Sequence, residues 1–361
     1  MVSVEILKQI IREGEEKLEK VKDSKEREVE NKLKDEMEEK ELATLFYGIR
    51  RAGKTTLALR LSQHYSTTYI NFEDERLMDL TIEDLTVLAD LWRGYDVIIL
   101  DEVQNVQGWE KLVHRLLGKH KFLITESILK ESDYRGALVG RNKSHLIMPF
   151  SYREYKKHVK ADLLAYIEHG GFPYPSLTNQ PELAREYAKD IFYREIAPST
   201  KKAEKLFFYL LDNPGITTTL RKIKHLMSLS EKTLQHYVDL FLRTFVFLEV
   251  EKHQAIYRYR KLYPTDNGLS RGSFARKVEA VVAQELYRQG YQPKYYSHNH
   301  GEIDFIVGDT AIQVTVELDK NAQREKKILE KWPGRKLLIS LRPHEEAILL
   351  ENFLLSPWDY L

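Results

Sequence analysis

Hydrophobic residues in the first half of the chain gather in short, largely apolar runs separated by helical patterns. These runs are four to six residues long and occupy residues 44–47, 69–72, 95–100 and 121–125. The intervening amphipathic patterns occupy residues 56–61, 83–93 and 109–117. Apolar strands that alternate with helices are typical of a parallel sheet covered on both faces. The pattern predicts an α/β fold whose ligands bind beyond the carboxyl ends of the strands.

The pattern changes after residue 200, where three helical segments precede two strands. We expect the helices at residues 206–211, 220–227 and 231–241, and the strands at residues 245–250 and 255–260. Three helices followed by a hairpin predict a winged helix-turn-helix in residues 201–265. Residues 266–361 form the last predicted unit, with a helix over residues 276–289 and strands at residues 301–307 and 311–316.

The N-terminal residues 1–41 are almost continuously charged. Apolar residues at Val4, Leu7, Ile10 and Ile11 form one helical stripe, and Glu–Lys pairs three or four apart support a solvated helix. We expect a helix or hairpin packed lightly on the next domain, and a partner-binding arm is the alternative.

Length and composition limit the classes of protein that are compatible with this chain. Its 361 residues suffice for two or three domains, and a net charge of +1 favours no partner for the chain as a whole. The absence of cysteine excludes disulfides and thiolate metal sites. No apolar run approaches the ~18 residues that span a membrane. We therefore expect a cytoplasmic protein that does not bind a membrane.

Charge is distributed unevenly along the chain. Residues 201–277 contain fifteen Lys and Arg and seven Asp and Glu, whereas residues 1–41 contain ten and fourteen. The excess of positive charge lies on the predicted winged helix and favours contact with DNA. The third helix would offer Lys232, Gln235 and His236 to a groove, and phosphate contacts would come from Lys222, Lys224, Arg258 and Arg260. Docking of a protein partner is the alternative.

A glycine-rich stretch between the first apolar run and the first helical pattern has the form Gly-x-x-x-x-Gly-Lys-Thr. It comprises Gly48, Ile49, Arg50, Arg51, Ala52, Gly53, Lys54 and Thr55, followed by Thr56. A strand, this loop and a helix form a phosphate-binding loop, in which backbone N–H groups surround a polyphosphate. Lys54 would reach the β- and γ-phosphates, and the Thr55 hydroxyl would bind Mg²⁺.

Acidic and hydroxyl side chains follow two later strands of the predicted sheet. Asp101 would hold Mg²⁺ opposite Thr55, and Glu102 would orient the attacking water for hydrolysis. Thr125 is placed to sense the γ-phosphate or to hold the water, with a plain strand-end hydroxyl as the alternative.

Several motifs occur in one order over residues 42–361 and resemble the archaeal ATPase family of P-loop proteins, which is related to AAA+ and STAND ATPases. Besides residues 48–55, they are residues 69–74, 100–110, 140–141, 148–155, 170–173 and 193–196. The resemblance implies ATP as the nucleotide, a helical lid at about residues 150–200, a winged helix and a C-terminal nuclease-like domain. Arg141, in the Gly-Arg step of the family, would stabilise transition-state charge in cis or across a subunit boundary, with a surface salt bridge as the alternative. Arg50 and Arg51, within the loop itself, are rival candidates for contact with a phosphate or a partner. The family usually has Thr-Gly-Ser after the fourth strand, whereas this chain has Thr125-Glu126-Ser127. The charge of Glu126 would repel a γ-phosphate unless the side chain is turned away.

The C-terminal residues resemble the PD-(D/E)XK restriction-endonuclease fold. A helical Glu279, a strand Asp304 and Gln313 match its metal-binding pattern, in which carboxylates hold Mg²⁺ and a lysine activates water. Thr315 stands where that lysine is expected, so a binding or assembly role is favoured over cleavage. Lys294 or Lys320 are candidates to supply the ammonium instead.

The sequence thus predicts a charged segment (residues 1–41), a P-loop ATPase domain with its lid (42–200), a winged helix-turn-helix (201–265) and a nuclease-like domain (266–361). We expect a protein that binds and hydrolyses ATP with Mg²⁺ and couples its nucleotide state to DNA binding. The alternatives are a switch that does not hydrolyse ATP and binds a protein partner, and a metal-dependent DNA nuclease regulated by ATP. An oligomer is compatible with each.

Overall fold

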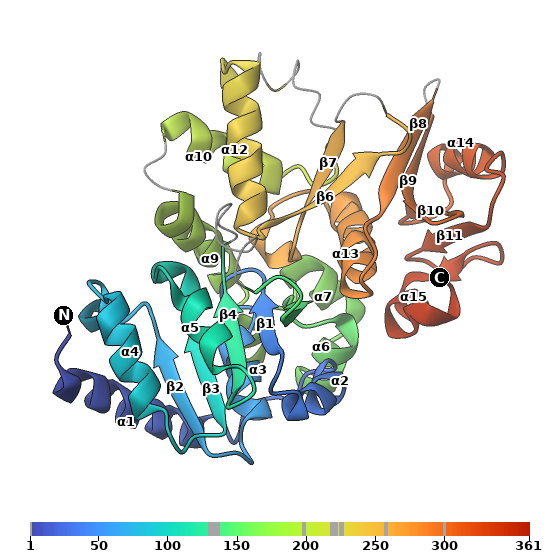
Figure 1. Ribbon diagram of the computed structural model, residues 1–361. Coiled ribbons are helices and arrows are strands. Elements are labelled where there is room, and N and C mark those ends of the chain that lie inside the picture. The colour runs from blue at the N-terminus through green and yellow to red at the C-terminus, as the bar shows by residue number, and fades with distance from the viewer. Residues whose placement is uncertain are drawn as a thin grey trace. The chain divides into compact units, whose positions relative to one another are not determined.

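The computed structural model describes residues 2–128, 138–196, 200–216, 223, 227–255, 259–298 and 301–361, without the side chains of residues 298, 320 and 321. The chain forms two compact units, Met1–Ile147 and Met148–Leu361 (Figure 1). Among the described residues, every helix is too short or too polar to cross a membrane.

The N-terminal unit is built on a five-stranded sheet with the order β2-β3-β4-β1-β5. Its strands are β1 (Ala43–Tyr47), β2 (Thr67–Asn71), β3 (Val97–Asp101), β4 (Lys121–Glu126) and β5 (Asn142–Leu146). All neighbouring strands are parallel, which confirms the predicted α/β fold. The carboxyl ends of β1, β3 and β4 therefore lie at the same edge of the sheet.

Helices cover both faces of this sheet because the strands are apolar on both sides. One face packs against α1 (Val4–Lys20), α4 (Ile82–Leu91) and α5 (Trp109–Leu116), whose apolar residues share one core with alternate strand residues. On the other side, α3 (Lys54–Leu61) contacts β3 and β4, and α2 (Glu30–Lys34) contacts α3. Three short 3₁₀ helices occupy Asp35–Glu38, Glu75–Leu77 and Val103–Asn105.

The charged N-terminal segment is packed more deeply than the sequence predicts. Leu7, Ile10 and Ile11 are buried in the same core cluster as Ile70 and Leu88. Figure 1 shows α1 lying beside β2 at the edge of the sheet. The expectation of light packing is therefore wrong for α1, because its short apolar stripe is enough to cover a sheet edge.

The C-terminal unit begins with short helices and ends in a mixed sheet. The helices before the sheet are α6 (Tyr152–His158), α7 (Leu163–His169), α8 (Pro173–Leu177), α9 (Leu183–Ile191), the π-helical turn Phe192–Ile196, α10 (Lys201–Leu211) and α12 (Glu231–Arg243). The later helices are α13 (Phe274–Arg288), α14 (Lys320–Leu329), α15 (Leu350–Leu355) and the 3₁₀ turns Asn267–Leu269 and Pro357–Asp359.

The sheet of this unit has seven strands in the order β12-β11-β10-β9-β8-β6-β7. They are β6 (Phe247–Lys252), β7 (Arg260–Pro264), β8 (Lys294–His298), β9 (Gly301–Val307), β10 (Thr310–Thr315), β11 (Lys336–Ser340) and β12 (Ile348–Leu349). β6 pairs in an antiparallel manner with β7, which overlaps the expected second strand of the hairpin only at Arg260, and residues 256–258 of that expected strand lie outside the described residues. β6 also pairs in parallel with β8, so the hairpin belongs to the C-terminal sheet.

The division of the chain differs from the boundaries that the sequence predicts. Residues 150–200 pack with the C-terminal half, since Glu168 pairs with Lys277 at 2.7 Å and Arg153 pairs with Glu285 at 2.8 Å. The expected boundary at residue 265 falls between two parts of one continuous sheet. A boundary after residue 147 replaces the one expected at residue 200.

Candidate nucleotide site

The predicted phosphate-binding loop lies between β1 and α3, as its strand–loop–helix context requires. Gly48 has a φ of 142° and Gly53 a φ of 99°, both in the region that favours glycine. A Cβ on Gly48 would clash with the carbonyl oxygen of Ile147, so both conformation and space demand glycine there. Gly53 is the N-cap of α3, and the helix N-terminus therefore faces the loop.

The Lys54 ammonium is folded into the loop. It donates to the carbonyl oxygens of Gly48 at 2.9 Å and Ile49 at 3.1 Å, and to the hydroxyl of Ser127 at 2.9 Å. Burial lowers the pKa of Lys54, and the carboxylates of Glu102 and Asp101 oppose that shift. The ammonium therefore lies within the field of both acidic residues.

Asp101, the last residue of β3, is held by three hydroxyl groups. Its Oδ1 accepts from Thr55 at 2.8 Å and from Thr125, and its Oδ2 accepts from Tyr69 at 2.6 Å. Burial, with the nearby Glu102 carboxylate, raises the pKa of Asp101, and the hydroxyl donors oppose the rise. The predicted pair of Thr55 and Asp101 is therefore brought together.

Glu102 lies beside this cluster with a φ of 55°. Its carboxylate accepts from Ser127 Oγ at 2.7 Å and from Gln104 Nε2 at 2.6 Å. Its backbone N–H donates to Thr125 Oγ1 at 3.1 Å. Thr125 is fully buried, and its hydroxyl connects Asp101 to the backbone of Glu102.

The sequence analysis did not identify three residues that contribute side-chain contacts to this site. Ser127 joins Lys54 to Glu102, Gln104 holds the second oxygen of Glu102, and Tyr69 holds Asp101. Tyr69 lies on β2, whose Asn71 is in register with Asp101. That register, rather than a local motif, is the signal that would have placed the tyrosine beside the acid.

The other residues of the loop differ in their contacts and burial. Arg50 makes a two-pronged ion pair with Glu73, with N–O distances of 2.6 and 2.7 Å. Arg51 is exposed and has a φ of 68°, and Thr56 is partly buried in the first turn of α3. Ile49 and Ala52 are buried, and the Ala52 carbonyl accepts from Arg27 at 3.0 Å.

Arg141 does not lie where a residue acting in cis on the γ-phosphate must lie. Its carbonyl oxygen accepts from the backbone of Ala43, the first residue of β1, and Asn142 is in register with Ala43. The loop follows Tyr47, at the other end of β1, and five strand residues span roughly 16 Å. The prediction of a role in cis is wrong because β5 starts directly after Arg141 and runs parallel to β1.

Glu126 ends β4 in register with Tyr47 and is fully buried. Neighbouring residues of a strand point to opposite faces, so its side chain leaves β4 on the face opposite Thr125. The acid that departs from the family pattern is therefore directed away from the hydroxyl cluster around Asp101.

The donor set of this site fits a magnesium nucleotide. Thr55 and Asp101 offer a hydroxyl and a carboxylate, the oxygen ligands that Mg²⁺ prefers. The loop offers backbone N–H groups at a helix N-terminus and one ammonium, which suit a polyphosphate.

The predicted nuclease-like residues also come together, within the C-terminal unit. Asp304 on β9 lies next to Gln313 on β10, whose Nε2 donates to Asp304 Oδ2 at 2.8 Å and to Glu325 at 3.2 Å. They line, with Glu279 of α13, a pocket of about 320 Å³. Gln313 Oε1 is buried and has no hydrogen-bond partner among the residues that the structure describes. Over the described part of the chain, however, no group of three His, Cys, Asp or Glu residues is arranged to hold a metal ion.

The ammonium beside this acidic cluster comes from Lys261 on β7. Lys261 pairs with Glu302 and lies 3.4 Å from Glu279. The candidate Lys294 is exposed and is not among the residues that line this pocket. Lys294 is therefore a wrong candidate, and the side chain of Lys320 lies outside the described residues. Burial and Glu279 raise the pKa of Asp304.

The predicted DNA-contacting residues are only partly described. Lys232 and His236 are exposed on α12, and Gln235 between them donates to Asp239 at 2.7 Å. Lys222, Lys224 and Arg258 lie outside the described residues. Arg260 is buried and pairs with Glu249 at 2.7 Å and Asp239 at 3.3 Å. Its charge is thus engaged inside the unit, which contradicts the predicted phosphate contact.

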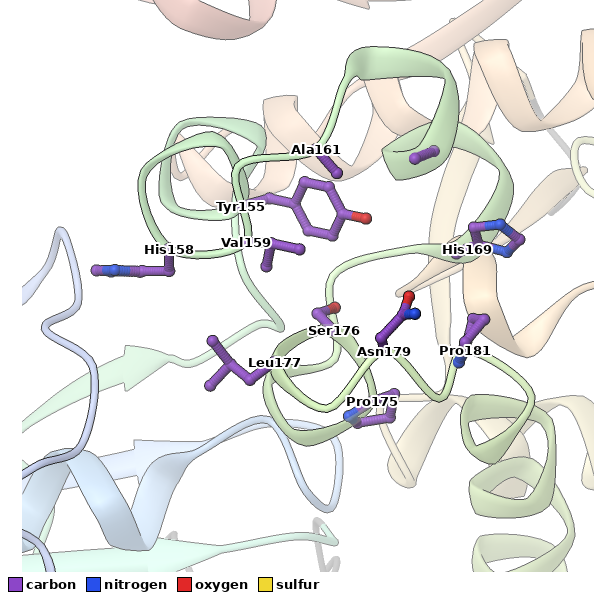
Figure 2. Close-up of a pocket in the computed structure, with 11 residues that line it drawn as sticks. Tyr155, His158, Val159, Ala161, His169, Pro175, Ser176, Leu177, Asn179 and Pro181 are labelled. Carbon is purple, nitrogen blue, oxygen red and sulfur yellow. The ribbon is translucent and has the colours of Figure 1, made fainter.

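A separate pocket of about 390 Å³ lies among α6, α7 and α8 and the segments that join them. Figure 2 shows the ring of Tyr155 facing Ser176 and Asn179 across it, with His158 and His169 on opposite sides. No carboxylate lines this pocket, and it shares no residue with the predicted sites.

Comparison with known proteins supports the class of the N-terminal unit. Residues 40–156 match the family model described as an AAA domain. This range contains the loop, both acidic residues and all five strands of the first sheet. Over this range the chain is similar to AAA domains, which supports the prediction of a P-loop ATPase fold.

Two relatives extend over most of the chain. An uncharacterized protein of Methanocaldococcus jannaschii is 28% identical over 344 residues, covering 80% of this chain and 78% of its own. An uncharacterized protein of Haemophilus influenzae is 24% identical over 356 residues, covering 83% and 89%. Among solved structures, DnaA from Aquifex aeolicus bound to AMPPCP is 15% identical, with a TM-score of 0.32, covering 60% of this chain and 86% of that one.

Proposed function

We propose that this protein binds ATP with Mg²⁺ and hydrolyses it at residues 48–55 and the adjoining acidic residues. The observation that carries the proposal is the placement of Thr55, Asp101 and Glu102 beside the Lys54 ammonium. Lys54 and Thr55 begin α3, which follows β1, and Asp101 and Glu102 lie at the end of β3. Because β1 and β3 both run parallel to β4, these two pairs of residues meet at one edge of the sheet.

Each residue has a role that follows from its chemistry. Thr55 and Asp101 would hold Mg²⁺, which neutralises phosphate charge when bound. Lys54 would exchange its carbonyl partners in the loop for phosphate oxygens, gaining charge-assisted hydrogen bonds. Glu102, held by Ser127 and Gln104, orients the attacking water and accepts its proton.

Substitution of Lys54 by alanine tests this proposal. We expect Lys54→Ala to lose ATP binding or turnover, measured by calorimetry and phosphate release. Lys111→Ala, on the exposed side of α5, is a matched control that should keep both. An unchanged rate in Lys54→Ala would overturn the assignment.

We also propose that the nucleotide state is coupled to DNA contact through the exposed face of α12. Lys232 and His236 are one turn apart on that face, opposite the buried Leu234, Val238 and Phe241. Contact with phosphates releases counterions and gives a steep dependence on salt. Binding that is absent or independent of salt would favour the alternative, a protein partner at the same helix.

A second candidate function, a metal-dependent nuclease, is favoured by Lys261. It supplies the ammonium that Thr315 cannot, and it lies within reach of Glu279 and Glu302. The unpartnered Gln313 Oε1 adds an amide oxygen next to Asp304. Mg²⁺-dependent cleavage of DNA that is lost in Asp304→Ala and kept in Lys54→Ala would support it. Failure to cleave single-stranded, duplex or branched DNA would leave a role in binding or assembly.

A further inference from the structure

We propose that Tyr69 and Lys17 are positioning residues of the ATPase site that orient the carboxylate of Asp101. Helix α1, which carries Lys17, then contributes to that site. Lys17 Nζ donates to Tyr69 Oη at 2.7 Å, and Tyr69 Oη donates to Asp101 Oδ2 at 2.6 Å. The inference rests on the proposed function, because Asp101 matters only if it serves a nucleotide site. It adds two residues and one helix that no motif assigns to that site.

The direction of this hydrogen-bond chain is determined by its donors. A lysine ammonium can only donate, so the Tyr69 oxygen must accept from Lys17. The one proton of the tyrosine hydroxyl is then directed to Asp101, whose carboxylate can only accept. Charge stands at both ends of the chain, which strengthens both hydrogen bonds. Tyr69 and Asp101 are each 4% exposed, so water competes little for the hydrogen bond between them, whereas Lys17 is exposed.

The Tyr69 hydroxyl binds the Asp101 oxygen to which the hydroxyls of Thr55 and Thr125 do not donate. Those two hydroxyls donate to Oδ1, and Tyr69 alone of the described donors binds Oδ2. Fixing Oδ2 prevents rotation of the carboxylate and keeps Oδ1 directed at Thr55. Donors that orient a metal-binding group commonly contribute about 10–100-fold in metal affinity or activity.

The close packing of helix α1 on β2 places Lys17 beside Tyr69. Gly14 lies one turn before Lys17, and a Cβ there would clash with the carbonyl oxygen of Tyr69. The ammonium of Lys17 lies 4.4 Å from the centre of the Tyr69 ring, so it also makes a cation–π contact. Leu7 and Ile11 hold the first turns of the helix in the core. A glycine in mid-helix costs helix stability, and the close approach to β2 accounts for it.

A second contact joins the N-terminal segment to the same site. Arg27, which is 9% exposed, donates to the carbonyl oxygen of Ala52 within the phosphate-binding loop at 3.0 Å. Glu30 accepts from the Arg27 backbone at 2.7 Å and pairs with Arg60 of α3 at 2.8 Å. The segment before β1 therefore contacts the loop, the helix that follows it and, through Tyr69, the acid.

The test compares Tyr69→Phe and Lys17→Met with Tyr95→Phe. Tyr95 is a matched control, because its hydroxyl donates to Glu15 of the same helix at 2.7 Å without a contact to Asp101. For each protein, the affinity for a fluorescent ATP analogue is titrated against Mg²⁺ and in EDTA, and the hydrolysis rate is measured in parallel. Melting temperatures show whether the variants fold.

We expect Tyr69→Phe to raise the half-saturating Mg²⁺ concentration about tenfold, with Lys17→Met changed in the same direction, while the affinity in EDTA and the control stay unchanged. A merely structural role would lower the melting temperature and leave the Mg²⁺ dependence as it was. An unchanged Mg²⁺ dependence in both variants would overturn the inference. Failure of the proposed function is distinguishable, because wild type would then bind the analogue without hydrolysing ATP, and the titration would still decide the role of Tyr69.

Discussion

The Thr55 hydroxyl lies 2.8 Å from Oδ1 of Asp101, although the two residues are 46 positions apart in the chain. One begins the helix after the phosphate-binding loop, and the other ends β3. No local sequence pattern brings these two residues into contact. The parallel sheet brings them together, and with them the Lys54 ammonium and the Glu102 carboxylate.

Thr125→Val should reduce ATP turnover by about 10–100-fold, in the range for lost support of a metal ligand. The substitution keeps the shape of the side chain and removes the hydroxyl that joins Asp101 to the backbone of Glu102. Steady-state hydrolysis measures the effect. Thr86→Val, on the exposed side of α4, is the control and should behave like wild type. Equal rates for both variants would show that the Thr125 hydroxyl is dispensable.

Gly48→Ala should abolish nucleotide binding and destabilise the N-terminal unit by about 1–3 kcal/mol. The added methyl group meets the carbonyl oxygen of Ile147, and a φ of 142° is unfavourable for alanine. Gly94→Ala is the control, since it has a φ of 103° with nothing within 4 Å of the added carbon. Chemical denaturation and nucleotide titration of both variants separate backbone strain from the clash. A Gly48→Ala protein that binds ATP normally would contradict the geometry of the loop.

Arg141→Ala should leave the ATPase rate of the isolated chain within about twofold of wild type, because a surface substitution away from the site changes little. Arg141 lies at the end of the sheet opposite the loop. The rate is measured over a range of protein concentrations. A large loss at every concentration would contradict the placement of Arg141, whereas a loss confined to high concentration would indicate a role across a subunit boundary.

Lys261→Met should destabilise the C-terminal unit by about 1–3 kcal/mol at neutral pH, because it removes the cation that lies among Glu279, Glu302 and the buried Asp304. Lys261 is 3% exposed and pairs with Glu279 and Glu302. Burial raises the pKa of Asp304, and a group with a raised pKa loses its contribution to stability as the pH rises through that pKa. The loss in Lys261→Met should therefore shrink as the pH falls and the carboxylates take up protons.

Urea denaturation between pH 4 and 8 measures this difference. Lys294→Met, on the exposed side of β8, serves as the control and should match wild type at each pH. A Lys261→Met variant as stable as the control would show that the acidic cluster does not need this cation.

The sequence was informative wherever a function depends on neighbouring residues. The loop at residues 48–55 is contiguous, and Asp101 follows an apolar strand, so both were predicted with their chemistry. Tyr69 was not, because its contact with Asp101 depends on the register between β2 and β3. Arg141 was misplaced for a related reason, since only the start of β5 shows at which end of the sheet it lies.

The C-terminal unit shows the same limit on a larger scale. Glu279, Asp304 and Gln313 were predicted as a group, and they line one pocket. Lys261 was missed because it lies on a hairpin that sequence patterns assign to a separate domain, while β6 pairs with β8 in the same sheet. Pairings between distant strands are set by tertiary packing, which no local pattern records.

The measurement that tests the central claim most directly is ATP hydrolysis by Glu102→Gln, with Mg²⁺·ATP affinity determined on the same protein. The amide keeps the shape of the side chain and its hydrogen bond from Ser127, and it removes the base. The account predicts that affinity stays within about twofold while turnover falls by about 10²–10⁴-fold. Turnover equal to that of wild type would contradict it.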